Sequence, residues 1–186
     1  MEDIMVGAPL NDETDRDAGA VFILFLNNDG TVGGHSTILA GDVGAAKGAK
    51  FGTALAPIGD LNGDGITEVV VGAPAADVSG RDDGEVYILF LSSHGAIDSV
   101  QKINAIDGNL PAGMIDAKDK FGSALAGPGD INSDGIPDLV VGAPGVDDGE
   151  TDAGAIHILY LNADGTVNFA QKISATEGGF TGLLDR

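Results

Sequence analysis

The stretch "GDLNGDGITEVVVGAP", residues 59–74, returns 70 positions later as "GDINSDGIPDLVVGAP", residues 129–144. Each copy places acidic and polar side chains at alternate positions of a nine-residue segment and continues directly into an apolar run. Carboxylates held close together repel one another unless a cation or hydrogen-bond donors compensate their charge. The occurrence of the same acidic segment and apolar run twice, 70 positions apart, indicates a repeated structural unit.

Other short motifs repeat in the same register and extend the unit over nearly the whole chain. "VGAP" occurs three times, "FG" twice, and an apolar segment followed by a polar turn occurs three times. These copies are "VGAP" at 6–9, 71–74 and 141–144, "FG" at 51–52 and 121–122, and "GAVFILFLNNDGTV", "GEVYILFLSSHGAI" and "GAIHILYLNADGTV" from Gly19, Gly84 and Gly154. We therefore interpret the chain as about three copies of one unit.

Each complete unit reads as four short strands separated by Gly, Asp and Asn turns, and no segment sustains a helical period. In the last copy the predicted strands are "FGSALAGPG", "PDLVVGAP", "AIHILYL" and "VNFAQKIS". The third is apolar at successive positions, which predicts burial of both its faces. Four-stranded sheets covered on both sides are typical of propeller blades. A two-layer sandwich is the alternative, and the long repeat disfavours it.

The predicted fold is therefore all-β, a single propeller-type domain over residues 1–186 built from four-stranded antiparallel blades. The predicted blades are residues 1–48, 49–118 and 119–186, and the first lacks its first strand. Asp3 aligns with the last polar position of the repeated acidic segment, so a third copy of that segment is incomplete. We expect a piece of a longer array, whose open edges favour self-association into a ring or filament, or contact with neighbouring repeats.

The acidic segments have the ligand spacing of a calcium loop. Oxygen donors stand at positions 1, 3, 5 and 9, a backbone carbonyl is available at position 7, and Gly at position 6 permits a sharp turn. Calcium takes six to eight oxygens, whereas magnesium demands a tighter octahedron. The predicted ligands are Asp60, Asn62, Asp64, Ile66 (carbonyl) and Glu68 in the first loop, and Asp130, Asn132, Asp134, Ile136 (carbonyl) and Asp138 in the second.

An EF-hand and a plain polar turn are the two alternatives to this calcium site. An EF-hand requires Glu at position 12 and flanking helices, but position 12 is Val71 or Val141 and the flanks are strand-like. A plain polar turn would also use Asp, Asn and Gly. Two copies in register, with all five positions filled, favour calcium.

Composition excludes several functional classes. The 186 residues include 29 acidic and 9 basic side chains, a net charge of −20, which disfavours nucleic acid and anionic membranes. There is no Cys, and the apolar runs are too short to insert into a membrane. The three histidines fall at unrelated places in the repeat, and no catalytic constellation accompanies them, so we expect no enzyme. His157 takes the position held by Phe22 and Tyr87, which predicts a packed strand residue.

"FG", the Asp-rich loop and "GAP" together resemble the FG-GAP repeat of integrin α-subunit propellers and of many bacterial secreted proteins. The resemblance implies calcium in the hairpin between the first and second strands, on the lower face, with the ten ligands named above; Glu68 stands where Asp is usual. Such extracellular sites bind calcium at roughly 10⁻⁴ to 10⁻³ M, which favours a secreted or surface location.

The resemblance also directs attention to the upper face, where integrins bind partners. The acidic loops from Leu10, Ala75 and Gly145 are expected there, opposite the calcium loops, as candidates for a protein or glycan ligand. A stable scaffold or adhesive module is the main functional prediction. An accessory domain of a secreted hydrolase is a further alternative.

Overall fold

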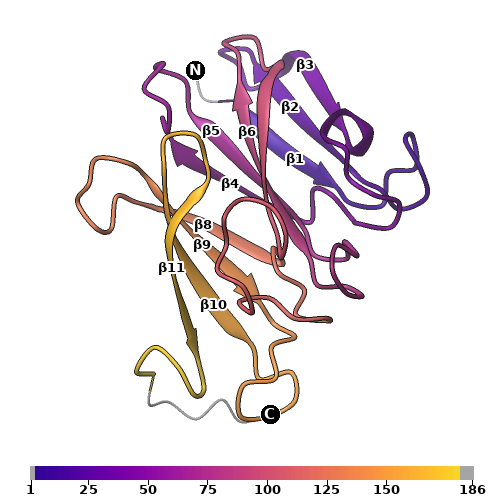
Figure 1. Ribbon diagram of the computed structural model, residues 1–186. Coiled ribbons are helices and arrows are strands. Elements are labelled where there is room, and N and C mark those ends of the chain that lie inside the picture. Colours follow the sequence, from indigo (N-terminus) through magenta and orange to yellow (C-terminus); the bar gives the residue numbers. More distant parts are fainter. Residues whose placement is uncertain (1–2, 181–186) are drawn as a thin grey trace.

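The computed structural model describes residues 3–180 and is all-β, with one short 3₁₀ turn. Three antiparallel sheets follow one another along the chain (Figure 1). Sheet 1 contains β1 (Ile4–Ala8), β2 (Ala20–Leu26) and β3 (Val32–Leu39), followed by the 3₁₀ turn η1 (Ala40–Val43). Sheet 2 contains β4 (Ala54–Gly59), β5 (Glu68–Ala73), β6 (Glu85–Leu91) and β7 (Ile97–Ile103). Sheet 3 contains β8 (Ala124–Gly129), β9 (Asp138–Ala143), β10 (Ala155–Leu161) and β11 (Val167–Ser174).

These elements confirm the predicted all-β fold of propeller-type blades. Within each sheet the strands pair in sequence order, and sheet 1 has three strands, as expected for a unit lacking its first strand. The third and fourth strands predicted for the last unit coincide with β10 and β11. Among the described residues, no helix has the length and apolarity needed to cross a membrane.

Apolar side chains form two cores, one in each seam between neighbouring sheets. The first seam joins sheets 1 and 2 and includes Ile23, Phe51 and Leu89. The second seam joins sheets 2 and 3 and includes Ile88, Phe121 and Leu159. Successive residues of a strand point to opposite faces, so β6 supplies Leu89 to one seam and Ile88 to the other. Sheet 2 is thus the central layer of the three.

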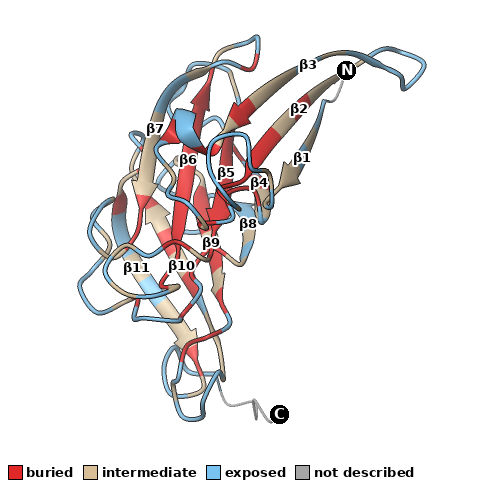
Figure 2. Ribbon diagram, turned by 90° about the vertical axis from the view of Figure 1, so that its right-hand side faces the viewer, coloured by how far each residue is buried: buried red, intermediate tan, exposed pale blue. Residues whose placement is uncertain are grey.

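The central and terminal sheets differ in burial. All seven residues of β6 are buried, whereas in β10 buried His157, Leu159 and Leu161 alternate with more exposed neighbours (Figure 2). The prediction that both faces of the third strand are buried is right for β6 and wrong for β10. β6 and β10 differ because no described residues form a further sheet against sheet 3. The uncovered side of sheet 3, which carries Ile156, Ile158, Tyr160 and Phe169, is called its outer face.

Each seam is closed by a Phe-Gly dipeptide that lies directly against two glycines of the preceding sheet. Phe51 and Phe121 form parallel bridges with Gly19 and Gly84, and their N–H groups donate to the Ala18 and Asp83 carbonyls, both at 2.9 Å. Strand glycines mark places where another backbone approaches closely. A Cβ on Gly72 would lie 2.0 Å from the Gly122 carbonyl oxygen. The repeated "FG" and "VGA" motifs therefore build the seams.

Candidate functional site

The two acidic loops occupy equivalent connections at the same end of their sheets. Residues 60–67 join β4 to β5, and residues 130–137 join β8 to β9. The structure therefore places them in the hairpin between the first and second strands, as predicted. A register shift in each strand pair lies beside the loop, between Pro57 and Gly59 and between Ala126 and Gly129.

The first loop is wound around the carboxylate of Asp60. Asp60 Oδ1 accepts hydrogen bonds from the N–H groups of Gly63 and Asp64, at 2.7 and 3.0 Å, and Oδ2 accepts one from Gly65 at 2.9 Å. Gly65 has φ of +87°, the left-handed conformation that Gly adopts without steric cost. Asn62 donates its side-chain amide to Asp64 Oδ2 at 2.9 Å. Residues predicted as ligands are thus gathered in one tight turn.

Glu68 completes this cluster from the first residue of β5. Its side chain is fully buried; Oε2 accepts the N–H of Leu61, while Oε1 has no hydrogen-bond partner in the structure. Carboxylate oxygens of Asp60, Asp64 and Glu68 lie within 4.8 Å of one another. Burial raises the pKa of Glu68; the hydrogen bond from Leu61 opposes this shift, and the charges of Asp64 and Asp60 add to it. A buried, unpaired oxygen beside two carboxylates fits a bound cation.

The second loop repeats the turn but uses its last acidic residue differently. Asp130 Oδ1 accepts from Asp134 N–H at 3.1 Å and Oδ2 from Gly135 N–H at 2.8 Å. Both oxygens of Asp138 accept backbone hydrogen bonds, from Ile131 at 2.8 Å and from Leu161 at 3.3 Å. Asp138 therefore ties its loop to β10. Among residues 3–180, only the first loop brings oxygens of three carboxylates within 4.8 Å of one another.

The remaining predicted ligands lie where the loop pattern places them. Asn132 donates to Asp134 Oδ2 at 2.8 Å, as Asn62 does to Asp64. Ile66 and Ile136 are half-buried, and each donates its N–H to the aspartate two residues earlier, at 2.8 and 2.9 Å. In sheet 1, Asp3 Oδ1 accepts the N–H of Leu26 at 3.3 Å, which reproduces the Asp138 to Leu161 contact. Asp3 thus keeps the structural contact of this position. The backbone N–H groups of Leu26 and Leu161 donate to the last acidic residue of the pattern. A pattern of side chains does not identify such backbone donors.

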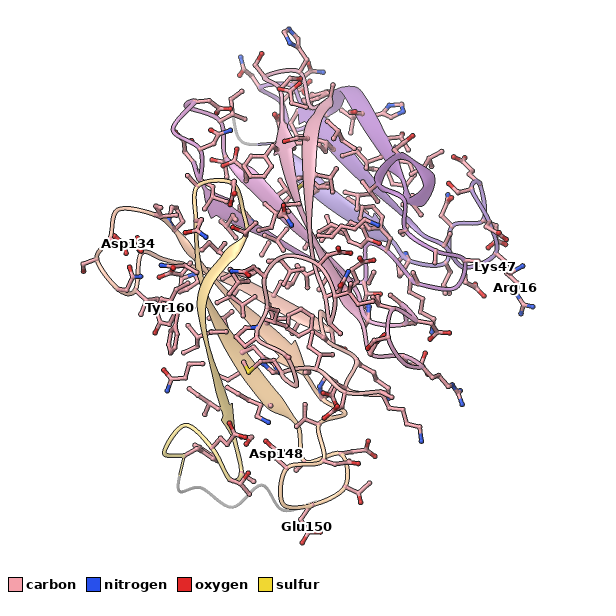
Figure 3. The ribbon with its side chains drawn as sticks, viewed as in Figure 1. Arg16, Lys47, Asp134, Asp148, Glu150 and Tyr160 are labelled. Atoms are coloured by element: carbon pink, nitrogen blue, oxygen red, sulfur yellow. The ribbon has the colours of Figure 1, made fainter. Side chains whose placement is uncertain are left out.

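The upper-face loops, residues 9–19, 74–84 and 144–154, lie at the opposite end of the sheets. Figure 3 shows this separation within sheet 3, where Asp134 and Asp148 lie at opposite ends. In each loop an early aspartate accepts the N–H five residues later, as Asp77 does from Asp82 at 2.7 Å. Burial raises the pKa of Asp83, but hydrogen bonds from Val78, Ser79 and Gly80 outweigh it and leave that pKa lowered. Many of these acidic side chains therefore hold the loops in shape.

His157 is a packed strand residue, as predicted. Its ring is fully buried against Phe121, with centroids 5.4 Å apart, and neither ring nitrogen has a hydrogen-bond partner in the structure. Burial, with a contribution from the positive charge of Lys172, lowers the pKa of His157 to about 4. In sheet 2 the same position is Tyr87, whose hydroxyl donates to Glu85.

Comparisons with known proteins agree with the repeat pattern. A model of the FG-GAP repeat matches residues 51–89 and 121–159. Human integrin alpha-IIb is 37% identical over 150 residues, which cover 77% of this chain and 13% of the integrin. Integrin alpha-4 of Xenopus laevis is 31% identical over 179 residues, covering 96% of this chain and 15% of the integrin. Mouse phosphatidylinositol-glycan-specific phospholipase D is 38% identical over 120 residues, covering 62% of this chain and 14% of the enzyme. The chain thus spans about 13–15% of the length of these relatives.

Proposed function

Because the chain carries FG-GAP repeats like those of integrin α-subunits, we propose that it is a calcium-stabilised, non-catalytic propeller segment with a structural or adhesive role. The observation that carries the proposal is the buried Oε1 of Glu68, which has no hydrogen-bond partner and lies beside Asp60 and Asp64. A hard divalent cation supplies the missing partner and offsets the repulsion among the three carboxylates.

The proposed ligands are the side chains of Asp60, Asn62, Asp64 and Glu68 with the Ile66 carbonyl, and of Asp130, Asn132, Asp134 and Asp138 with the Ile136 carbonyl. An all-oxygen donor set without His or Cys suits calcium better than zinc or copper. In this role the cation stabilises each hairpin, and the loop residues orient the following strand. Asp3 occupies the equivalent position in sheet 1, where it accepts the Leu26 N–H.

The proposed location follows from the expected affinity. Extracellular calcium modules bind with dissociation constants of roughly 10⁻⁴ to 10⁻³ M, so sites of this type are filled outside a cell and largely empty in cytosol. The stabilising role therefore requires a secreted or surface protein.

Thermal unfolding with and without a chelator tests the cation. At a calcium concentration about twenty times the dissociation constant, binding adds about 2 kcal/mol of stability per site. Asp60→Asn and Asp130→Asn together should lower the Tm in calcium and reduce the difference in Tm between calcium and chelator. Asp98→Asn, which changes an exposed carboxylate on β7, is the control and should retain the calcium response. A wild-type Tm that calcium does not change would refute the metal assignment.

We propose in addition that the chain associates through its outer faces. Ile4 and Val6 on sheet 1 are 48% and 43% exposed, and Ile156 and Phe169 on sheet 3 are 43% and 60% exposed. In sheet 2, the strands β5 and β6, which correspond to β1 and β10, are buried. Burying such faces removes apolar surface from water. A ring or filament of head-to-tail copies, or neighbouring repeats of a longer chain, satisfies both faces.

Light scattering over a range of concentrations in calcium tests the association. The wild type should form assemblies larger than a monomer, whereas Val6→Lys or Phe169→Lys should dissociate them by placing a charge on one outer face. Ile106→Lys replaces a 69% exposed residue between β7 and β8 and should have no effect. A stable wild-type monomer would contradict self-association.

A ligand-binding role for the acidic upper-face loops is the second candidate. It is favoured by exposed acidic side chains such as Glu13 and Glu150 beside those that hold the loops. Asp147 and Asp148 are poor test positions, because Asp147 accepts the Asp152 N–H and Asp148 binds Lys172 and Ser174. Glu13→Gln with Glu150→Gln should weaken capture of a protein or glycan ligand without changing the Tm. An accessory role beside a hydrolase domain is consistent with the phospholipase relative.

A further inference from the structure

A hollow of about 510 Å³ opens on the outer face of sheet 3, where β9 ends and β10 begins. Its wall includes Ala124, Gly142, Ala143, Gly154, Ile156 and Phe180. We name the part between Gly142 and Gly154 the glycine notch. The hollow lies at the opposite end of the sheet from the cation loops and borders the upper-face loop 144–154. Most of its lining residues are small or apolar, and Ser123, Asp152 and Ser174 are its polar members.

The equivalent positions of sheets 1 and 2 are filled by Phe-Gly dipeptides. Cβ atoms on Gly7 and Gly19 would each lie 2.0 Å from the carbonyl oxygen of Gly52 or Phe51. On Gly72 and Gly84 they would lie 2.0 and 2.2 Å from the oxygens of Gly122 and Phe121. Only a residue without a side chain permits this approach, and both phenylalanine rings are fully buried. Sheets 1 and 2 thus each contain a pair of glycines equivalent to Gly142 and Gly154, and a Phe-Gly dipeptide lies against each pair.

Gly142 has no comparable neighbour in the described structure. A Cβ there would meet Ala124 Cβ at 3.1 Å as its nearest atom, and a Cβ on Gly154 would meet Pro144 Cα at 3.5 Å. Gly142 is not among the glycines with positive φ, so its backbone conformation does not require Gly. Gly inside a strand weakens it unless another backbone approaches. Gly142 therefore leaves space for a Phe-Gly dipeptide, but no described residue makes this contact.

We propose that the glycine notch binds the Phe-Gly dipeptide of an extended peptide, of the type found in the first strand of an FG-GAP repeat. The ring enters the apolar hollow and the dipeptide backbone lies on Gly142 and Gly154. Its Phe N–H donates to the Ala153 carbonyl, the position equivalent to the Ala18 and Asp83 acceptors.

The ligand is a Phe-Gly segment from outside the described residues and not the folded core of a second copy. Phe51 and Phe121 are both fully buried within their own seams, so a folded copy cannot present either ring. The inference therefore goes beyond association of folded copies through their outer faces, because folded copies would leave the notch without a phenylalanine. It is also independent of the cation loops at the opposite end of the sheet.

Fluorescence polarisation with the full 186-residue chain in calcium tests the site. The probe is a labelled peptide of sequence DAKDKFGSALAG, copied from residues 116–127. We expect saturable binding, and replacing the phenylalanine of the peptide by alanine should weaken it at least about tenfold, because most of the apolar burial is lost. Gly142→Ala should abolish binding, since its methyl group occupies the space of the peptide backbone.

Gly34→Ala is the matched control, because Gly34 has ordinary φ and the nearest atom to a Cβ there is Phe25 Cδ2 at 3.7 Å. It should bind the peptide as the wild type does. The Tm of Gly142→Ala, expected to stay near that of the wild type, separates a blocked notch from misfolding. Absent binding at about 1 mM peptide, equal binding of the alanine peptide, or full binding by a folded Gly142→Ala chain would each overturn the proposal. Because association through the outer faces would cover Ile156, which also lines the hollow, the assay is run at chain concentrations below those at which copies associate.

Discussion

Sheets 2 and 3 are two copies of the same repeat but lie in different surroundings. In sheet 2 both faces of the third strand are packed, one in each seam. In sheet 3 the corresponding residues Ile156, Ile158 and Tyr160 face outward, and Tyr160 stacks on Phe169, with ring centroids 5.6 Å apart. Each of these repeats therefore carries two apolar faces, and its neighbours decide whether both are buried.

The largest expected difference between the two sheets is at the paired glycines. Gly72→Ala places a methyl group where the Gly122 carbonyl oxygen lies, so the second seam must open; we expect a loss of more than about 4 kcal/mol of stability. Gly142→Ala meets only the neighbouring Ala124 and should stay within about 1 kcal/mol of the wild type. Urea unfolding of both variants measures the difference. Equal losses would mean that the seam tolerates the methyl group or that sheet 3 is covered.

The next difference concerns core side chains at the same position of the third strand. Ile88 is fully buried in the second seam, whereas its counterpart Ile158 is partly exposed. Ile88→Ala should cost about 3 to 4 kcal/mol through lost burial and the cavity left behind, and Ile158→Ala about 1 kcal/mol. Urea unfolding below the concentration at which copies associate checks this pair. A similar large loss at both positions would show that the outer face of sheet 3 is packed in solution.

A further difference depends on pH and concerns His157, which takes the position of Tyr87. Because the pKa of His157 is about 4 when folded and near 6.5 when unfolded, the unfolded chain takes up the proton first as the pH falls. Stability present above pH 6.5 is therefore lost between pH 6.5 and about 4, by roughly 3 kcal/mol. His157→Phe should remove this loss.

Urea unfolding at pH 7, 5.5 and 4, in chelator to exclude calcium effects, measures this pH dependence as the difference between variant and wild type. His94→Gln alters an exposed histidine in the β6–β7 hairpin and should leave the profile unchanged. A His157→Phe profile parallel to the wild type would show that the buried imidazole is protonated without cost.

The repeated motifs predicted most of the fold because their physics is local. Glycine, aspartate and asparagine turns separate short apolar segments, which predicts strands, and "AIHILYL" is β10 from its first to its last residue. The acidic loops were placed correctly for the same reason: oxygen donors at alternate positions need only a tight turn to converge. The difference between Glu68 and Asp138 could not be predicted. It depends on which backbone N–H groups surround each carboxylate, and Leu161, which binds Asp138, lies 23 residues away.

The sequence by itself determined the repeat, the strands within it and the two acidic turns, because these follow from spacing and from the conformational preferences of a few residues. Only the tertiary structure decided which of the equivalent faces are covered, that "FG" packs in each seam against a pair of glycines, and that Gly142 and Gly154 form a notch. Burial and close backbone approach are properties of neighbouring sheets. Each repeat therefore presents equivalent faces, and the neighbouring sheets determine which of these faces are buried.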